Sequence, residues 1–252
     1  MIPAERHRAI LALLSSQEVV SINQLIQQLR VSHMTIRRDI GKLEADCRVI
    51  SVSGGIQLTE SMHSELSHEV KITQNQSAKV SIALLASELV KPDMTVYLDA
   101  GTTTLEIAHK LIHRDDIMVV TNDFVIAAFL MQNSKCSLYH TGGKVDRENQ
   151  SCVGSKAARL LNDLNIDLAF VSTSSWSQRG ISTPSEDKIQ VKQAIVRTAK
   201  TNYLVSDSSK YGKIATFHAV DMNCFDAVIT DSNFPSSCIQ DLSEQGVKVV
   251  IG

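Results

Sequence analysis

The feature that most constrains the fold is a regular alternation of short apolar segments with helical segments from residue 77 onward. The strand-like segments lie at 95–99, 117–121, 137–141, 167–172, 202–206, 227–230 and 247–251. A buried helix precedes them, and most are separated by helical segments at 105–112, 123–131, 154–164, 187–200 and 236–245. Short apolar strands that alternate with helices favour a mostly parallel sheet covered by helices on both faces. We therefore expect an α/β domain over residues 77–252.

Composition excludes several other classes of protein. Apolar residues make up 43% of the chain and charged residues 21%, which is enough to bury a core and argues against disorder. No segment approaches the roughly 18 uninterrupted apolar residues of a membrane span, and the charged start does not resemble a secretory signal. We therefore expect a cytoplasmic protein with no membrane partner. The five cysteines are scattered without metal-ligand spacing, so we expect no metal site and no cofactor.

The first 58 residues begin with three short helical patterns. Pro3 suits the first turn of a helix, and Ser21 with Gln24 fits a capping box at the start of a second one. Ser32 is a suitable N-cap for a third helix over 33–44. The residues expected to face inward on this third helix are Met34 or Thr35, then Ile36, Ile40 and Leu43.

A glycine-linked pair of strand-like runs follows these helices, at 48–52 and 54–58. Two helices joined by a tight turn, over about 20–39, and then a hairpin predict a winged helix-turn-helix. Residues 1–58 carry seven basic and five acidic side chains, a net charge of +2, whereas the remainder carries −4. A basic head on an acidic body indicates that the head meets a polyanion. The alternative is an ordinary helical subdomain with solvated arginines.

The third helix carries the most specific motif of the chain. Residues 31–40 read VSHMTIRRDI, and Gly54 and Gly55 follow. This string resembles the helix-turn-helix signature of DeoR-type transcription regulators, Val-Ser-x-x-Thr-Ile-Arg-Arg-Asp-Leu, with Ile40 in place of the leucine. Residues 51–53 stand where family members often place Arg and His, so we expect a wing that lacks basic side chains. The residues that the motif and its surroundings place against DNA are Ser21, Ser32, His33, Met34, Thr35, Arg37, Arg38 and Arg48.

The segment over residues 59–76 is polar, mixed in charge and without a core stripe. We expect it to be a linker with at most a loose helix around 64–70. The chain then divides into a DNA-binding domain over 1–58, this linker and the α/β domain.

Polar and small residues gather where the predicted strands end. Gly101 and the threonines after it offer N–H groups and hydroxyls at a helix N-terminus, which suits a phosphate. Asp99 suits a sugar hydroxyl, and Lys210 places a positive charge on the same phosphate. Taken singly, these groups also fit a helix cap, a turn or a solvated lysine, but ligands of such sheets lie beyond the carboxyl ends of the strands. The residues predicted to form one site are Asp99, Gly101, Thr102, Thr103, Thr104, Thr121, Asn122, Gly142, Gly143 and Lys210.

These motifs, together with Ser209-Lys210-Tyr211-Gly212, resemble the effector domain of DeoR-type regulators, which is related to ribose-5-phosphate isomerase. The resemblance implies a sensor of phosphorylated sugars or sugar acids that has lost catalysis. Where the isomerase has a glutamate before a lysine, this chain has Val191 before Lys192, which leaves proton transfer without an obvious base. We predict no catalytic residue. Residues 173–178 and Asp146-Arg147 depart from the family pattern, and we expect them to shape the pocket around the sugar.

Together the motifs predict a DNA-binding transcription regulator and not an enzyme. We expect a repressor of a carbohydrate or sugar-acid catabolic operon, whose binding to double-stranded operator DNA changes when a phosphorylated sugar-type effector binds. One small DNA-binding domain makes a limited interface, so we expect a homo-oligomer on repeated or palindromic half-sites. The alternatives are a sugar-phosphate isomerase-like enzyme with a DNA-binding head, and a scaffold whose α/β domain binds no ligand.

Overall fold

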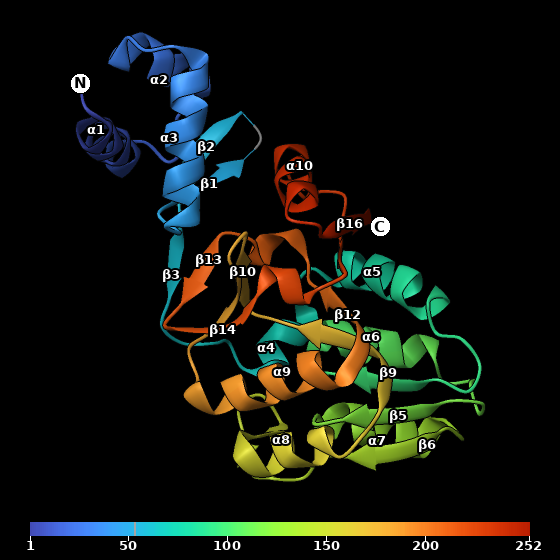
Figure 1. Ribbon diagram of the computed structural model, residues 1–252. Helices are drawn as coiled ribbons and strands as arrows, with labels where there is room; N and C mark the ends of the chain where they lie inside the picture. Colours follow the sequence, from blue (N-terminus) through green and yellow to red (C-terminus); the bar gives the residue numbers. More distant parts are fainter. Residues whose placement is uncertain (53) are drawn as a thin grey trace.

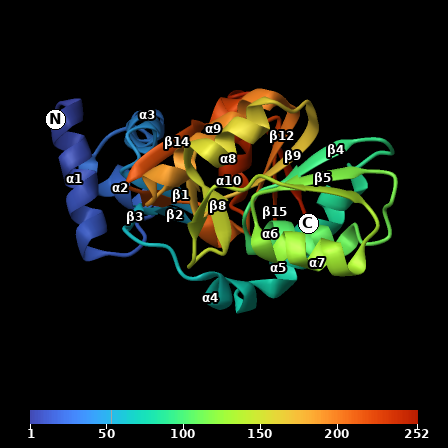
Figure 2. The same ribbon diagram turned by 90° about the horizontal axis from the view of Figure 1, so that it is seen from below.

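The computed structural model describes residues 1–52 and 54–252, and it contains a small N-terminal domain attached to a larger α/β domain (Figure 1). The N-terminal domain stands out from one end of the larger one, as the view from below also shows (Figure 2). Within the described ranges, every helix is too short or too polar to cross a lipid bilayer.

Three helices and a hairpin make up the N-terminal domain. They are α1 (Pro3–Ser16), α2 (Ile22–Leu29), α3 (His33–Ala45), β1 (Val49–Val52) and β2 (Gly55–Leu58), with the two strands antiparallel. The Ser21 hydroxyl accepts a hydrogen bond from the backbone N–H of Gln24 at 3.1 Å. Ser32 accepts one from the backbone N–H of Thr35 at 3.2 Å. Each serine satisfies an N–H group that the first helical turn leaves unpaired, so the predicted helix starts and the winged helix-turn-helix are confirmed.

The inward face of α3 holds the N-terminal domain together. Ile36, Ile40 and Leu43 are at most 5% exposed and share a core with Ile10 of α1 and Leu25 of α2. Their spacing places them on one side of the helix, as the sequence predicts. The open choice between positions 34 and 35 is resolved against the methionine, which points outward and is 67% exposed.

The segment expected to be a linker is docked on the larger domain. Within it, β3 (Glu60–Met62) pairs in parallel with β13 (Lys213–Ala215), and α4 (His68–Thr73) follows. The Glu60 N–H donates to the carbonyl oxygen of Gly212 at 3.1 Å, which extends this pairing. Nothing in the sequence indicates this docking, because the partner strand lies far along the chain, whereas α4 overlaps the loose helix expected around 64–70.

Seven parallel strands form the central sheet, in the order β16-β15-β12-β9-β4-β5-β6. Their bounds are β4 (Thr95–Leu98), β5 (Met118–Thr121), β6 (Ser137–His140), β9 (Ile166–Ser172), β12 (Ala199–Val205), β15 (Ala227–Thr230) and β16 (Lys248–Ile251). Each corresponds to one of the seven apolar segments, so the predicted mostly parallel α/β architecture is confirmed. The direction in which strands are added reverses between β4 and β9, which creates a crevice at their carboxyl ends.

Helices cover both faces of this sheet. One group comprises α5 (Gln76–Glu88), α6 (Thr102–Lys110) and α7 (Phe124–Asn133), and the other comprises α8 (Gly154–Asn162), α9 (Glu186–Thr198) and α10 (Ser236–Glu244). Alternate strand residues face the two groups: Val96 and Leu98 pack with the first, and Tyr97 with the second. Two aliphatic cores, one on each face, result from this period of two.

Several short elements lie outside the predicted pattern. They are the hairpin of β7 (Lys144–Asp146) and β8 (Ser151–Val153), the antiparallel sheet of β10 (Ser175–Ser177), β11 (Gly180–Thr183) and β14 (Phe217–Asp221), and the 3-10 turns η1 (Ser208–Lys210) and η2 (Met222–Cys224). Strands β10 and β14 of the three-stranded sheet lie at the end of the α/β domain nearest the N-terminal domain (Figure 1).

The two domains share a hydrophobic core at this end. Ile50 of β1 is 4% exposed and belongs to the same buried cluster as Trp176, Tyr211 and Phe234. Gly212 has φ +81°, and a Cβ atom there would lie 2.1 Å from Cδ1 of Ile50. Glycine is therefore required for both the backbone conformation and the close approach of the hairpin.

Candidate functional site

An exposed basic face lies on α3. His33, Met34, Arg37 and Arg38 are all exposed, and their spacing of four places them on one side of the helix, opposite the buried face. Ser32 and Thr35 are tied together in the N-cap, where their hydroxyls lie 2.9 Å apart. The predicted residues on this helix therefore form one continuous surface.

The other predicted DNA contacts flank this face. Ser21 is half-buried and uses its hydroxyl to cap α2, so its backbone marks the start of that helix. Arg48 is exposed just before β1. Ser51 and Val52, at the end of β1, are half-buried, whereas the prediction for Ser53 lies outside the described residues.

A cavity opens at the carboxyl ends of β4, β5, β9 and β12, in the crevice where the strand order reverses. The predicted residues that line it are Asp99, Gly101, Thr102, Thr103, Asn122 and Lys210. These come from the ends of β4 and β5 and from η1, so the structure brings together groups that lie up to 111 positions apart in the sequence. A crevice of this kind is where doubly wound sheets bind ligands.

Four predicted residues do not line this cavity. The Thr104 hydroxyl donates to the carbonyl oxygen of Asp99 at 2.6 Å, which fixes the loop from the inside. The Thr121 hydroxyl accepts from the backbone N–H of Asp123 at 3.1 Å. Gly142 and Gly143 both have positive φ and turn the chain after β6 against the first residues of α8. All four position backbone near the cavity.

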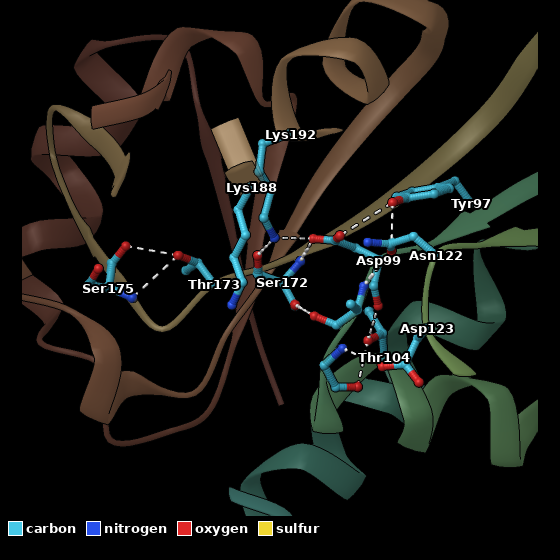
Figure 3. Close-up of polar contacts among 12 residues, drawn as sticks. Tyr97, Asp99, Thr104, Asn122, Asp123, Ser172, Thr173, Ser175, Lys188 and Lys192 are labelled. Atoms are coloured by element: carbon cyan, nitrogen blue, oxygen red, sulfur yellow. Dashed lines mark hydrogen bonds and ion pairs between the residues drawn. The ribbon is translucent and has the colours of Figure 1, made fainter. Parts of the chain in front are cut away.

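Asp99 is fully engaged within the protein. Its carboxylate pairs with Lys192 and accepts from the backbone N–H of Ser172 at 3.0 Å and from the Tyr97 hydroxyl at 3.3 Å (Figure 3). Burial, and then the Asp99 charge, raise the pKa of Tyr97 well above its usual value, so the phenol stays protonated. Asp99 therefore holds Lys192 in the cavity lining, and its direct contact with a sugar hydroxyl stays a prediction.

The loop after β4 was expected to present free backbone N–H groups, but two of these groups are already hydrogen-bonded within the protein. The N–H of Ala100 donates to Asn122 at 3.0 Å, and that of Gly101 donates to Asp123 at 3.1 Å. A Cβ atom on Gly101 would lie 2.5 Å from the Ser172 hydroxyl, so only glycine permits this approach. Burial raises the pKa of Asp123 to about 6, although three N–H donors oppose the shift. Thr102 and Thr103 are the residues of the loop that remain directed at the cavity.

Lysines dominate the polar lining. Five of them face the cavity against three carboxylates, and the full set is Lys71, Lys79, Lys188, Lys192 and Lys210 with Glu65, Asp99 and Asp207. Burial, followed by Lys71 and Lys79, lowers the pKa of His68, which therefore adds no charge near neutral pH. The cavity thus carries an excess of two positive charges, which favours a ligand with a dianionic group.

Sequence reasoning predicted only Lys210 among these lysines. Lys188 and Lys192 lie four positions apart on α9, a spacing that places both on one helical face and offers the only local signal for them. Lys71 comes from α4, inside the segment that was interpreted as a linker, and Lys79 comes from α5, just after it.

Two buried polar atoms of the lining have no hydrogen-bond partner among the described residues. They are Nε2 of His68 and Oγ of Ser151, on residues that are 4% and 0% exposed. Buried polar atoms are nearly always hydrogen-bonded, so this pair indicates a site that a polar ligand completes. Across the described residues, no cluster of three or more His, Cys, Asp or Glu side chains has the arrangement to hold a metal ion.

Both domains match known protein families. The DeoR-like helix-turn-helix domain matches residues 6–62, and the DeoR C terminal sensor domain matches residues 74–232. An uncharacterized HTH-type transcriptional regulator of Haemophilus influenzae is 49% identical over 100% of this chain and 98% of its own length. The chain belongs to the DeoR family of transcriptional regulators.

A more distant DeoR-family relative is the glycerol-3-phosphate regulon repressor of Escherichia coli, which is 27% identical over 97% of each chain. Among solved structures, ribose 5-phosphate isomerase A of Methanocaldococcus jannaschii is 19% identical and aligns over 55% of each chain with a TM-score of 0.41. Within this DeoR-family protein, Glu65, His68 and Lys71 lie between the two matched ranges, although all three line the cavity of the sensor domain.

Proposed function

We propose that this DeoR-family regulator is a repressor of a carbohydrate or sugar-acid catabolic operon. Its α3 face binds operator DNA, and a phosphorylated sugar or sugar acid in the sensor cavity changes that binding. The observation that carries the proposal is the excess of two positive charges in a cavity at the strand ends of a chain with a helix-turn-helix domain. A phosphomonoester carries nearly two negative charges at neutral pH, so it matches this excess.

Several features support the individual parts of the proposal. The name of the glycerol-3-phosphate regulon repressor connects a full-length relative with a small phosphorylated polyol. In this chain, Lys210, Thr102 and Thr103 line the cavity and supply a positive charge and hydroxyl donors for a phosphate. On α3, Arg37 and Arg38 supply the exposed cations that phosphate and guanine contacts need.

We infer that the cavity senses its ligand without converting it. Val191 stands where the resemblance to ribose-5-phosphate isomerase led us to expect a glutamate, and its alkyl side chain lines the cavity beside Lys192. Proton transfer next to a carbonyl group requires a base within hydrogen-bond reach of the carbon-bound proton, and valine provides none. Isomerisation of a pentose phosphate by the purified protein would contradict this inference.

We further propose that the protein acts in the cytoplasm as a homo-oligomer. A single winged helix covers one half-site, and two or more copies bound to repeated half-sites raise the specificity to a useful level. Sedimentation of the full chain with and without DNA tests this part: a monomer that binds an isolated half-site at full affinity would overturn it.

The test of the proposed function combines ligand binding with DNA binding. A duplex selected from a random pool serves as the DNA, and phosphorylated sugars and sugar acids are compared with their unphosphorylated counterparts. A ligand at about 100 times its Kd raises the stability of the folded state by about 2.7 kcal/mol, which thermal unfolding detects. We expect at least one phosphorylated compound to stabilise the protein and change the Kd for DNA, with the response weakened in Thr102→Val and Lys210→Met. Lys248→Met is the control, because Lys248 is exposed on β16.

The proposal fails if no member of the panel changes either the unfolding temperature or the Kd for DNA. It also fails if the unphosphorylated counterparts act equally well, because the positive excess of the cavity would then have no role in recognition.

A further inference from the structure

The carboxylate of Glu65 forms ion pairs with two of the lysines that face the cavity. Its Oε2 atom lies 2.9 Å from Nζ of Lys188 and 3.3 Å from Nζ of Lys71. The side chain of Glu65 is 10% exposed, and all three residues line the cavity. Burial opposes ionisation of this carboxyl, but Lys188 and Lys71 outweigh it and lower its pKa to about 2, so the group is an anion at neutral pH. The protein thus places its own carboxylate beside lysines that suit an anionic ligand.

The stretch that carries Glu65 leads directly to the DNA-binding domain. Six positions before it, the Thr59 hydroxyl donates to the carbonyl oxygen of Cys47 at 2.9 Å, just after α3. Between the two anchors lies β3, held on β13, and the chain from 63 to 67 has no helix or strand. An extended chain spans at most about 3.3–3.6 Å per residue, so little slack separates the cavity from the winged helix.

The surroundings of Glu65 have hydrogen-bonding capacity that it does not use. Nε2 of His68 and Oγ of Ser151 are buried in the same cavity lining without partners among the described residues. Nζ of Lys71 also donates to Oδ1 of Asn149, and Nζ of Lys188 lies 3.7 Å from Oδ2 of Asp146. Each lysine carries three donor hydrogens, so these partners and the single Glu65 oxygen still leave part of the set unused. A ligand with more oxygen atoms would engage these groups more completely.

We propose that Lys71 and Lys188 form an anion subsite of the effector cavity, which Glu65 occupies when the effector is absent. An anionic group of the effector, either the phosphate that Lys210 also faces or a carboxylate elsewhere on the ligand, displaces Glu65 and pairs with the two lysines. The displaced residue no longer ties the stretch between β3 and α4 to the cavity wall, so binding changes how the connector holds the DNA-binding domain. This inference rests on the proposed function, and it adds that the ligand replaces a carboxylate of the protein itself, that of Glu65. The effect on DNA binding arises because the effector prefers the state in which Glu65 is displaced.

The test measures the affinity of the full-length protein for inorganic phosphate by calorimetry at constant ionic strength. We expect Glu65→Gln to bind phosphate at least about tenfold more tightly than the wild type, because the amide is a weaker competitor for the lysines. The double variant Glu65→Gln with Lys188→Met should lose this gain. A second arm with glycolate, a small carboxylate, assigns which kind of anion the subsite prefers.

Glu106→Gln is the matched control. Glu106 is a buried carboxylate of the same domain that accepts hydrogen bonds from Gln76 and His109 and does not line the cavity. Its removal changes the net charge by the same amount without freeing Lys71 or Lys188. We expect its phosphate affinity to stay within about threefold of the wild type, because Lys71 and Lys188 remain paired with Glu65 and the Glu106 charge acts on Lys79 instead.

The inference is wrong if Glu65→Gln binds phosphate and glycolate no more tightly than Glu106→Gln, or if neither anion binds to Glu65→Gln at all. The proposed function stands or falls separately, on the response of DNA binding to the phosphorylated panel. If Glu65→Gln does not fold, amide hydrogen exchange of the wild type replaces it. Saturating phosphate should then speed exchange over residues 60–67, and unchanged exchange in that stretch would overturn the inference.

Discussion

Asp39 and Arg37 lie two positions apart on α3 and have opposite environments. Asp39 is 1% exposed and accepts hydrogen bonds from the Arg6 guanidinium at 2.6 and 3.0 Å and from His7 at 3.1 Å. Burial alone would raise the pKa of Asp39, but Arg6 and His7 reverse that effect and lower it. The aspartate of the helix-turn-helix motif therefore ties α1 to α3, whereas Arg37 remains exposed.

The residue-scale prediction for DNA binding concerns this exposed arginine. Arg37→Ala should weaken operator binding and reduce the slope of log K against log salt by about 0.9. With one phosphate contact fewer, binding releases about one counterion fewer from the DNA. Filter-binding or calorimetric titrations over a range of salt concentrations measure both the affinity and the slope. Arg8→Ala removes an equal charge from the exposed side of α1 and is the control. An unchanged slope in Arg37→Ala would remove Arg37 from the contact surface.

A second residue-scale prediction concerns the buried ion pair of the cavity floor. Lys192→Met leaves the Asp99 carboxylate, which is 1% exposed, without its cation, so we expect a loss of about 3–5 kcal/mol in the free energy of unfolding. Lys200→Met breaks a pair with Asp167 in which the lysine side chain is 72% exposed, and should cost at most about 1 kcal/mol. Urea unfolding of both variants decides the matter: equal losses would show that burial of the first pair is unimportant.

At the scale of elements, the sequence predicts the helices and strands that are long and regular. All seven central strands are visible as apolar segments because both sheet faces are buried. The strands β7, β8 and β10 are three residues long, and their pairing depends on partners elsewhere in the fold, so local patterning does not reveal them. The residues that line the cavity also fall into a predictable group and an unpredictable one. Its strand-end residues could be predicted from topology, whereas Glu65, His68 and Lys71 enter through the docking of β3 and α4.

The element-scale prediction compares two glycines in the same backbone conformation. Gly212 has φ +81° and Gly246 has φ +83°, but a Cβ atom at Gly246 meets no atom within 4 Å, whereas one at Gly212 meets Ile50. Both Gly→Ala variants should lose roughly 1–2 kcal/mol to the left-handed backbone. Gly212→Ala should lose about 1–3 kcal/mol more, because the hairpin must move or repack. Chemical unfolding checks this difference, and equal losses would mean that Ile50 adapts without cost.

At the scale of the whole molecule, the two domains are joined by more than a connector. Ile50 of the wing lies in the main core of the sensor domain, and Cys47 and Ser177 face each other across the junction at 3.6 Å. The connector adds β3, docked on β13, and Glu65 in the cavity. The cavity, the connector and the winged helix therefore belong to one physically continuous unit.

The whole-molecule prediction concerns stability in acid. Because folding lowers the pKa of Glu65 from 4.5 to about 2, the unfolded state binds more protons between these values. The Glu65 ion pairs therefore contribute at most about 3 kcal/mol of stability above pH 4.5, and this contribution is lost as the pH falls toward 2. Glu65→Gln should be less stable than the wild type at pH 7, and most of this difference should be gone near pH 2.5, where about 1 kcal/mol of the contribution remains. Glu69→Gln, on the exposed side of α4, is the control and should follow the wild type at both values.

The shared core also gives the protein an internal spectroscopic probe. Trp176 is the single tryptophan of the chain, it is 0% exposed, and its ring stacks on Phe234 with the ring centres 5.4 Å apart. Its emission therefore reports on the junction beneath the wing and on no other part of the molecule. Ligand-induced separation of the domains would hydrate the indole and shift its emission to longer wavelengths, so the movement can be followed in real time without any label.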